Sequence, residues 1–292
     1  MTWLENLQEK AHSIYSQGGQ DGLIEEIFTH IPIVNNPPFA VEFGFNSNSY
    51  EGGSGANTCN LAKNKGWKTL LFDSQHANKN INLHRRILDM DNVNDVFSEF
   101  DVPRTPDYLS IDIDSADLWL MDTILAEYKP SLVSVEYNSH FPYDAAITMD
   151  PYTKKYIGGR IYGASLKALT MVAEQHNYCL VAIACSLDAF YIRKELLNDV
   201  PLPYISWKPY TGIIGHPICH NIQLGNCLID YEEWLRSHDL EKARETAKPI
   251  VAQSLLSHPF TKAPHPLHLR HCQNCKYRKS YCGDVPHNLR AR

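Results

Sequence analysis

The chain has 292 residues, of which 43% are hydrophobic and 21% are charged, so it can bury a sizeable core in one large domain or two small ones. Its net charge of −6 and pI of about 6.1 argue against a general attraction to nucleic acid or an anionic membrane. Because the chain has no run of roughly 20 apolar residues, no secretory signal at its start and only scattered cysteines, we expect a cytoplasmic protein with reduced thiols.

The first 37 residues form a leader with a helical pattern. Apolar residues recur at helical spacing up to Ile31, with a break at Gly18-Gly19, and Pro37-Pro38 closes the segment. Apolar stripes of this kind usually pack on a core, so we expect the leader to pack on a sheet. The alternative is that it covers a ligand pocket.

The stretch from Ala40 to Asp73 is predicted to be strand, glycine-rich turn, helix and strand. The first strand ends at Gly44, a helix is expected from about Asn57 to Lys65, and the second strand ends at Asp73. Glycines after one strand and an acid at the end of the next suit a nucleoside-bearing cofactor, with the acid accepting hydrogen bonds from the ribose hydroxyls. The glycine spacing is not G-x-G-x-x-G, which argues against a dinucleotide.

Further strands and helices alternate along the chain up to Arg193. Strands are expected at Tyr108–Ile113 and Leu132–Tyr137, helices at 118–128 and 162–176, and a closing antiparallel hairpin at 178–184 and 189–192. This alternation predicts a doubly wound α/β sheet with helices on both faces. The segment from Ser139 to Arg160 is long for a connector, which suggests a functional loop.

The last part, residues 195–292, is predicted to be an irregular extension. It contains a charged helix near Tyr231–Ala247 and a basic tail rich in cysteine and histidine. We therefore divide the chain into a leader (1–37), a catalytic domain (38–194) and this extension.

Five motifs in order resemble the FkbM-type S-adenosylmethionine-dependent methyltransferases. They are VEFGFNSNSYEGGSGANT, WKTLLFD, DYLSIDIDSADLW, LVSVEYN and YGASLKAL, and the resemblance covers roughly Pro38 to Lys194. It implies the Rossmann-like class I methyltransferase fold, a sheet of seven strands of which the last is antiparallel. It also implies S-adenosylmethionine as the cofactor. It does not name the acceptor.

The resemblance assigns most of the cofactor site to strand ends and the first helix. Glu42 would orient the amino end of the cofactor, and Gly44 would clear space for it. Residues at the start of the helix either bind the methionine carboxylate or only cap the helix. Asp112 either binds the methionine part or belongs to a metal site. The full predicted set is Glu42, Gly44, Asn46, Ser54, Gly55, Asn57, Thr58, Asp73 and Asp112.

Carboxylates and an amide follow two strands that are expected to be neighbours. Asp112 and Asp114 come at the end of one strand, and Glu136 and Asn138 at the end of the next. Parallel strands end at the same edge of a sheet, so these side chains should lie close together. Repulsion between them must be offset by a proton, a cation or the sulfonium. All-oxygen ligation suits Mg²⁺ or Mn²⁺, as in catechol O-methyltransferase-type enzymes. The alternative is local hydrogen bonding.

Two residues are candidates for a catalytic role. Histidine as a residue type titrates near neutrality, so His140 is the natural candidate for the general base, although a loop histidine is more often solvated or in contact with substrate. Asp114 is the second candidate, through its place in the carboxylate cluster.

The tail offers ligands for a structural zinc ion. A site of three cysteines and one histidine is available, although a free-thiol tail or a disulfide is also consistent with the spacing. The residues are His271, Cys272, Cys275 and Cys282.

These observations predict a methyltransferase that methylates an oxygen, or less readily a nitrogen, of a small-molecule or sugar-like acceptor, with a metal as a possible aid. The alternatives are a nicotinamide-dependent oxidoreductase and a nucleic-acid-binding protein that uses the basic tail. The overall acidity makes nucleic acid the least favoured partner. The sequence leaves open whether the chain forms a homodimer.

Overall fold

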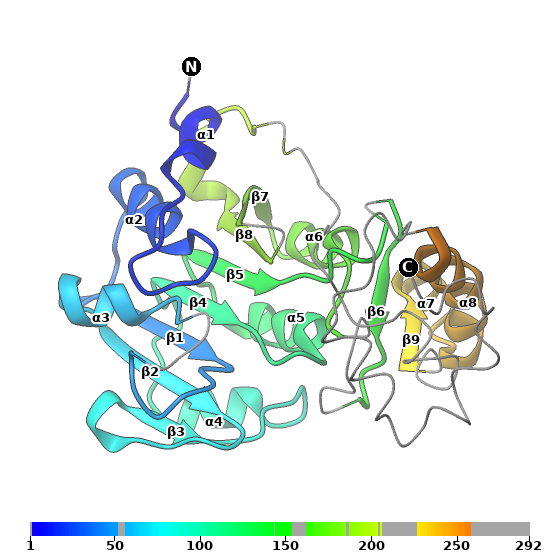
Figure 1. The fold of residues 1–292 in the computed structure, drawn as a ribbon, viewed down its shortest axis with the longest axis horizontal. Helices are drawn as coiled ribbons and strands as arrows, with labels where there is room; N and C mark the ends of the chain where they lie inside the picture. Colours follow the sequence, from blue (N-terminus) through cyan, green and yellow to red (C-terminus); the bar gives the residue numbers. More distant parts are fainter. Residues whose placement is uncertain are drawn as a thin grey trace, which may run out of the picture.

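The computed structural model describes residues 2–51, 56–142, 144–153, 162–184, 187–203, 205 and 227–257. Strands dominate its centre, and helices flank them (Figure 1). The helices are α1 (Trp3–Asn6), α2 (Gln20–His30), α3 (Cys59–Lys65), α4 (Val93–Glu99), α5 (Asp117–Glu127), α6 (Leu166–Gln175), α7 (Tyr231–Ser237) and α8 (Leu240–Ser257). Within the part described, no helix combines the length and apolar character needed to cross a bilayer.

The main sheet has seven strands in the order β3-β2-β1-β4-β5-β8-β7. Strands β1 to β5 pair in parallel, and β8 pairs antiparallel with both β5 and β7. This is the class I methyltransferase sheet that the sequence predicts. The strands are β1 (Phe39–Phe43), β2 (Lys68–Asp73), β3 (Leu83–Arg85), β4 (Tyr108–Ile111), β5 (Leu132–Glu136), β7 (Tyr178–Ala184) and β8 (Asp188–Arg193).

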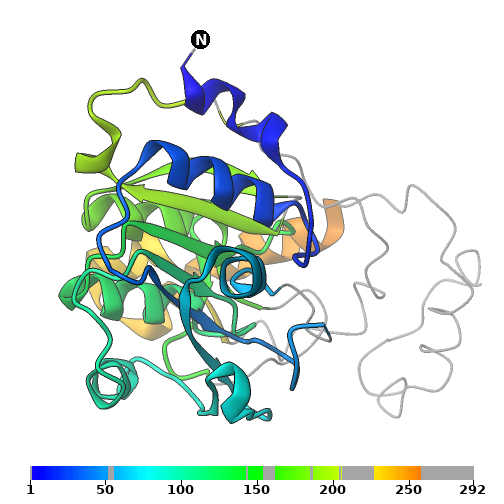
Figure 2. The same cartoon turned by 90° about the vertical axis from the view of Figure 1, so that its left-hand side faces the viewer.

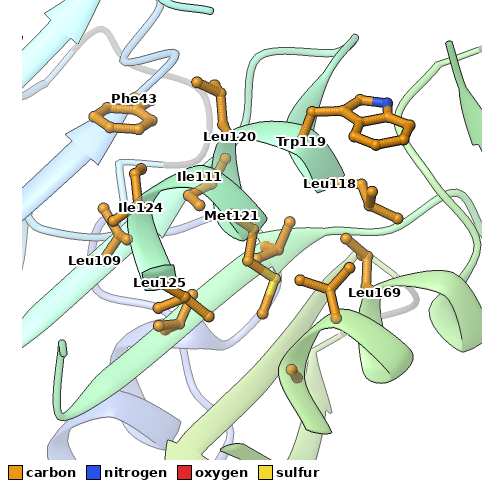
Figure 3. Packing of buried hydrophobic residues seen from close by; sticks show 14 of the residues in the cluster. Phe43, Leu109, Ile111, Leu118, Trp119, Leu120, Met121, Ile124, Leu125 and Leu169 are labelled. Atoms are coloured by element: carbon orange, nitrogen blue, oxygen red, sulfur yellow. The ribbon is translucent and has the colours of Figure 1, made fainter. Parts of the chain in front are cut away.

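Alternate residues of the central strands point to two separate apolar layers. On β4, Leu109 and Ile111 face the layer that contains α4, α5 and α6, whereas Tyr108 faces the opposite side. Figure 3 shows the first of these layers around α5. The near-continuous burial of both faces is what a parallel sheet covered by helices requires. The runs of apolar residues in the sequence therefore mark the centre of the sheet.

The leader covers the other face of the sheet. Leu4 and Leu7 from the first turns, and Leu23 and Ile27 from α2, pack with residues of β4, β5, β7 and β8, and Figure 2 shows α1 and α2 lying along this face. The apolar stripe thus packs on the sheet as expected. The helical pattern is interrupted over residues 11–19, because the chain turns there before α2 begins.

The long segment after β5 contains an unpredicted strand. Strand β6 (Ile147–Met149) pairs antiparallel with β9 (Leu228–Asp230) of the C-terminal extension. The indole Nε1 of Trp119 on α5 donates to the carbonyl of Met149 at 2.8 Å, and Tyr231 packs edge-on against the same indole. The part of the extension from 227 to 257 is therefore built onto the catalytic domain. Its predicted single helix is divided at His238, whose φ is +52°.

Candidate functional site

A cavity of about 710 Å³ opens at the carboxyl edge of the parallel strands. Its size is in the range of small-molecule sites, and this edge is where open α/β sheets bind ligands. It is lined from the ends of β1, β2, β4 and β5, from the segment after β3 and from the leader. The lining residues are Gln17, Phe43, Gly44, Asn46, Phe72, Asp73, Ser74, Gln75, Arg86, Ile87, Leu88, Asp112, Ile113, Asp114, Ser115 and Glu136.

Glu42 joins the first strand to the two residues that precede α3. Its Oε1 accepts from the backbone N–H of Asn57 at 2.8 Å, and its Oε2 accepts from the backbone N–H of Thr58 at 3.0 Å and from the Thr58 hydroxyl. Burial raises the pKa of Glu42 to about 7 despite these donors. Glu42 does not line the cavity, and the Asn57 and Thr58 amides, predicted either to meet a cofactor carboxylate or to cap the helix, are used by Glu42.

The side chain of Asn57 links this helix start to a buried acid that the sequence reading missed. Its Nδ2 donates to the Ser110 hydroxyl and to Oδ2 of Asp188, both at 3.1 Å. Asp188 also accepts from Nε2 of Gln20 in the leader at 2.9 Å. Burial raises the pKa of Asp188. The only sequence signal for Asp188 is an acid at the start of an otherwise apolar strand.

Gly44 allows two strand ends to approach closely. Its φ is +74°, and a Cβ built on it would lie 1.5 Å from the carbonyl oxygen of Asp112. The space that the glycine leaves is thus filled by the chain leaving β4. Gly44 also lines the cavity, and its predicted role of clearing space for the cofactor stays a prediction.

Asp73 lies at the cavity and organises the loop around it. Oδ1 accepts from the backbone N–H groups of Gln75 and His76, both at 2.7 Å, and from the His76 ring at 2.9 Å. Oδ2 accepts from the backbone N–H of Asn46 at 2.8 Å. Burial alone would raise the pKa of Asp73, but these donors outweigh it and lower the pKa. Asp73 is therefore charged, and Oδ2, with a single bond, retains acceptor capacity for a ribose hydroxyl.

Three of the four predicted metal ligands come together. Asp112, Asp114 and Glu136 each place one carboxylate oxygen within 4.8 Å of the others. Burial, and then repulsion between neighbouring carboxylates, raises the pKa of Asp112 and of Glu136, and burial raises that of Asp114. Asp117, the next acid along the chain, caps the turn below them with bonds from the Ile113 and Ser115 amides.

Asn138 and His140 are placed differently from the prediction. The Asn138 amide donates to the carbonyl of Tyr162 at 3.0 Å, and its oxygen accepts from the backbone N–H of His140 at 3.0 Å. Asn138 thus shapes the turn after β5. His140 is buried with its ring edge-on to that of Tyr162, and it is not among the described residues that line the cavity. Its role as general base stays a prediction.

Several predicted ligands lie outside the described residues. These are Ser54 and Gly55 in the first turn and the four zinc candidates His271, Cys272, Cys275 and Cys282.

The wall of the cavity is acidic. Asp73, Asp112, Asp114 and Glu136 face it, against one basic residue, Arg86, whose guanidinium is 2.7 Å from Glu99. Among the described lining residues, carboxylates therefore outnumber bases by four to one. Such a wall favours a ligand with positive charge and disfavours a pyrophosphate.

Comparisons with known proteins give a limited likeness. No family model matches the chain, and no curated protein matches it, so membership of the FkbM type stays a prediction. Among solved structures, the N-terminal domain of EvdMO1 with SAH bound is similar at 12% identity and a TM-score of 0.34, over 53% of this chain and 74% of that one. The same domain in the presence of SAH and D-fucose gives 12% and 0.33, over 53% and 75%.

Two glycines with similar φ, Gly44 after β1 and Gly66 at the end of α3, provide a matched test. We expect Gly44→Ala to lower the free energy of unfolding by at least about 3 kcal/mol, because left-handed strain and overpacking against Asp112 add. Gly66→Ala, with a φ of +71° and nothing within 4 Å of the new Cβ, should cost only about 1 kcal/mol. Urea denaturation measures both. Equal losses would contradict the close approach of β1 and the β4 end.

The buried acids predict an unusual pH dependence of stability. Their pKa values are raised on folding, to about 7 for Glu42 and about 6 for Asp117, so between pH 4.5 and 7 the folded state binds more protons than the unfolded state. The free energy of unfolding should therefore fall as the pH rises through this window, by about 3 kcal/mol from Glu42 alone.

Urea titrations of the ligand-free protein at pH 5 and 7.5 would measure this fall. Glu42→Gln should reduce the fall in the free energy of unfolding between these two pH values, even where the substitution also changes stability equally at both. Stability that is level or rises with pH would show that these groups are not held as described. The pKa of Asp73 is lowered on folding, so Asp73 makes stability rise with pH, but only below pH 3.8, the ordinary pKa of an aspartate.

Proposed function

We propose that this chain is an S-adenosylmethionine-dependent methyltransferase. The observation that carries the proposal is the acidic cavity at the carboxyl edge of a class I methyltransferase sheet. S-adenosylmethionine carries a sulfonium and an ammonium against one carboxylate, so its net charge complements this wall. A nicotinamide dinucleotide carries a pyrophosphate that the same wall would repel. The βαβ unit at the start of the domain suits either S-adenosylmethionine or a nicotinamide dinucleotide. The charge of the cavity favours S-adenosylmethionine.

Each end of the cavity suits a different part of the cofactor. At the β2 side, Oδ2 of Asp73 would accept from the ribose, and the apolar residues Ile87 and Leu88 would pack against the adenine ring. At the β4 and β5 side, Asp112 and Glu136 would face the cationic sulfonium and ammonium groups. The resemblance to FkbM-type enzymes supports the same orientation.

Methyl transfer needs an acceptor atom in line with the sulfonium carbon. The acceptor oxygen forms a bond to the methyl carbon as the carbon–sulfur bond breaks, and the hydroxyl proton passes to a base. Asp114 is the candidate base, because it lies at the cavity and its raised pKa makes it a better proton acceptor than an ordinary aspartate. Alignment in a shielded pocket would supply most of the rate enhancement. Carboxylates that accept hydrogen bonds favour a small, hydroxyl-bearing acceptor such as a sugar.

A divalent cation is a second, alternative ligand for the same carboxylates. Asp112, Asp114 and Glu136 offer hard oxygen ligands, and the buried Oε2 of Glu136 has no hydrogen-bond partner among the described protein atoms. These three residues would hold Mg²⁺ or Mn²⁺. When bound, such an ion lowers the pKa of an acceptor hydroxyl and fixes its position. Asn138 is not included in this set, because its amide is used in the turn after β5.

Calorimetry with purified cofactors tests the proposal. The protein should bind S-adenosylmethionine and not NAD⁺ or NADP⁺. Asp73→Ala should weaken this binding by tenfold or more, since a charged hydrogen bond is worth about 1.5–3 kcal/mol. Asp95→Ala, an exposed acid on α4 that does not line the cavity, is the control. Binding of NAD⁺ alone, or an Asp73 variant with unchanged affinity, would overturn the assignment.

Titration with Mn²⁺, followed by electron paramagnetic resonance in the presence of S-adenosylmethionine, tests the metal site. We expect one bound ion per chain and its loss in Asp114→Asn, which keeps the size of the side chain while removing its charge. The matched control is Asp95→Asn. An absence of Mn²⁺ binding by the unaltered protein would leave the carboxylates as acid–base groups only.

A further inference from the structure

The turn between the two leader helices forms a strap at the cavity. We define the strap as residues 13–19. Ser16, Gly18 and Gly19 within it are buried, whereas Gln17 between them is exposed and lines the cavity. A single exposed side chain between buried neighbours indicates that the backbone of the strap is fixed and that Gln17 is directed outward by it.

Asp21 at the start of α2 holds the strap in shape. Its Oδ2 accepts from the backbone N–H of Ile14 at 2.7 Å, and from those of Tyr15 and Ser16 at 2.8 Å each. The Ser16 hydroxyl donates to the same oxygen at 2.8 Å. Four donors on one buried carboxylate oxygen constrain three successive residues, so the position of Gln17 is set before any ligand binds.

Gln20 attaches the strap to the sheet beside α3. Its Oε1 accepts from the Gly18 amide at 2.6 Å, and its Nε2 donates to Asp188 at 2.9 Å. Asp188 in turn binds Asn57, whose backbone N–H is held by Glu42. A continuous series of hydrogen bonds therefore runs from the strap to the start of α3.

The other end of the strap lies against α3 itself. The ring of Tyr15 packs with the cluster that contains Phe45 and Cys59, and the ammonium of Lys63 lies 5.4 Å from its centroid. Tyr15 beside α3 and Gln20 on Asp188 therefore hold the chain on either side of Gln17. Gln17 thus lines the same cavity as Asp112 and Glu136, the residues that the proposed function gives to the amino-acid end of the cofactor.

Among the described side chains, this end of the cavity is lined mainly by hydrogen-bond acceptors. Asp112, Asp114 and Glu136 accept and, when ionised, cannot donate, and the amides of Asn57 and Thr58 just before α3 are used by Glu42. A methionine carboxylate placed there needs a hydrogen-bond donor. A positively charged donor would offset the attraction of the acidic wall for the sulfonium. The amide of Gln17 provides a donor and an acceptor without adding charge.

We propose that Gln17 is a cofactor-binding residue, which the strap positions to hydrogen-bond the amino-acid end of S-adenosylmethionine. This inference rests on the proposed function. It assigns to the leader a direct part in cofactor selection, in addition to its packing on the sheet.

Two ligands and two glutamine variants test the proposal. Gln17→Ala should weaken the binding of S-adenosylmethionine about three- to tenfold, the range of one neutral hydrogen bond. It should leave unchanged the affinity for methylthioadenosine, which lacks the amino-acid end. Gln8→Ala, an exposed glutamine of the leader that does not line the cavity, should alter neither affinity. The melting temperature of ligand-free Gln17→Ala should equal that of the unaltered protein.

The outcomes are distinguishable. Unchanged affinity of Gln17→Ala for S-adenosylmethionine would overturn the role of Gln17 and leave the proposed function intact. An equal loss for both ligands would overturn the placement at the amino-acid end. If the unaltered protein binds neither ligand, the proposed function fails and this inference fails with it.

Discussion

The carboxylate of Glu42 determines how the first strand meets the first helix. A buried acid at the end of β1 is satisfied by two backbone amides and one hydroxyl at the start of α3, so strand and helix are joined where the cavity begins. Because the Asn57 backbone is held by Glu42, the Asn57 side chain is directed to Asp188. Asp188 in turn accepts from Gln20 of the leader. The strap and β8 are thus linked to the residues before α3 by one series of hydrogen bonds between buried side chains. Its geometry depends on a group whose pKa lies near neutrality.

The sheet could be predicted because each of its strands is recognisable from its own local sequence. Buried parallel strands need uninterrupted apolar runs, and runs such as the one from Leu132 appear in the sequence without reference to distant partners. The β6–β9 pair could not be predicted, since three-residue strands some 80 positions apart carry no local periodicity. Gln17 and Asp188 were missed for the same reason. Their importance comes from tertiary contacts, and a glutamine in a turn or an acid opening a strand is common.

The positions of the candidate site residues could be predicted at the ends of strands. They could not be predicted in the turns that follow the strands. Asp112, Asp114 and Glu136 meet because neighbouring parallel strands end at one edge. The assumption that residues two apart share a face does not account for Asp114, since β4 ends at Ile111 and Asp114 has a φ of +57°. Asn138 lies beyond the end of β5, where its side chain is used in the local turn. Turn geometry depends on hydrogen bonds that residue spacing does not reveal.

The carboxylate cluster also bears on how a turnover would end. In methyl transfer from a sulfonium, the sulfur loses its positive charge and becomes a neutral thioether. The acids that draw in the charged cofactor would therefore hold the spent molecule less strongly, because the Coulomb attraction to the sulfur disappears. Under the proposed function, a wall of this kind favours exchange of the by-product for fresh methyl donor.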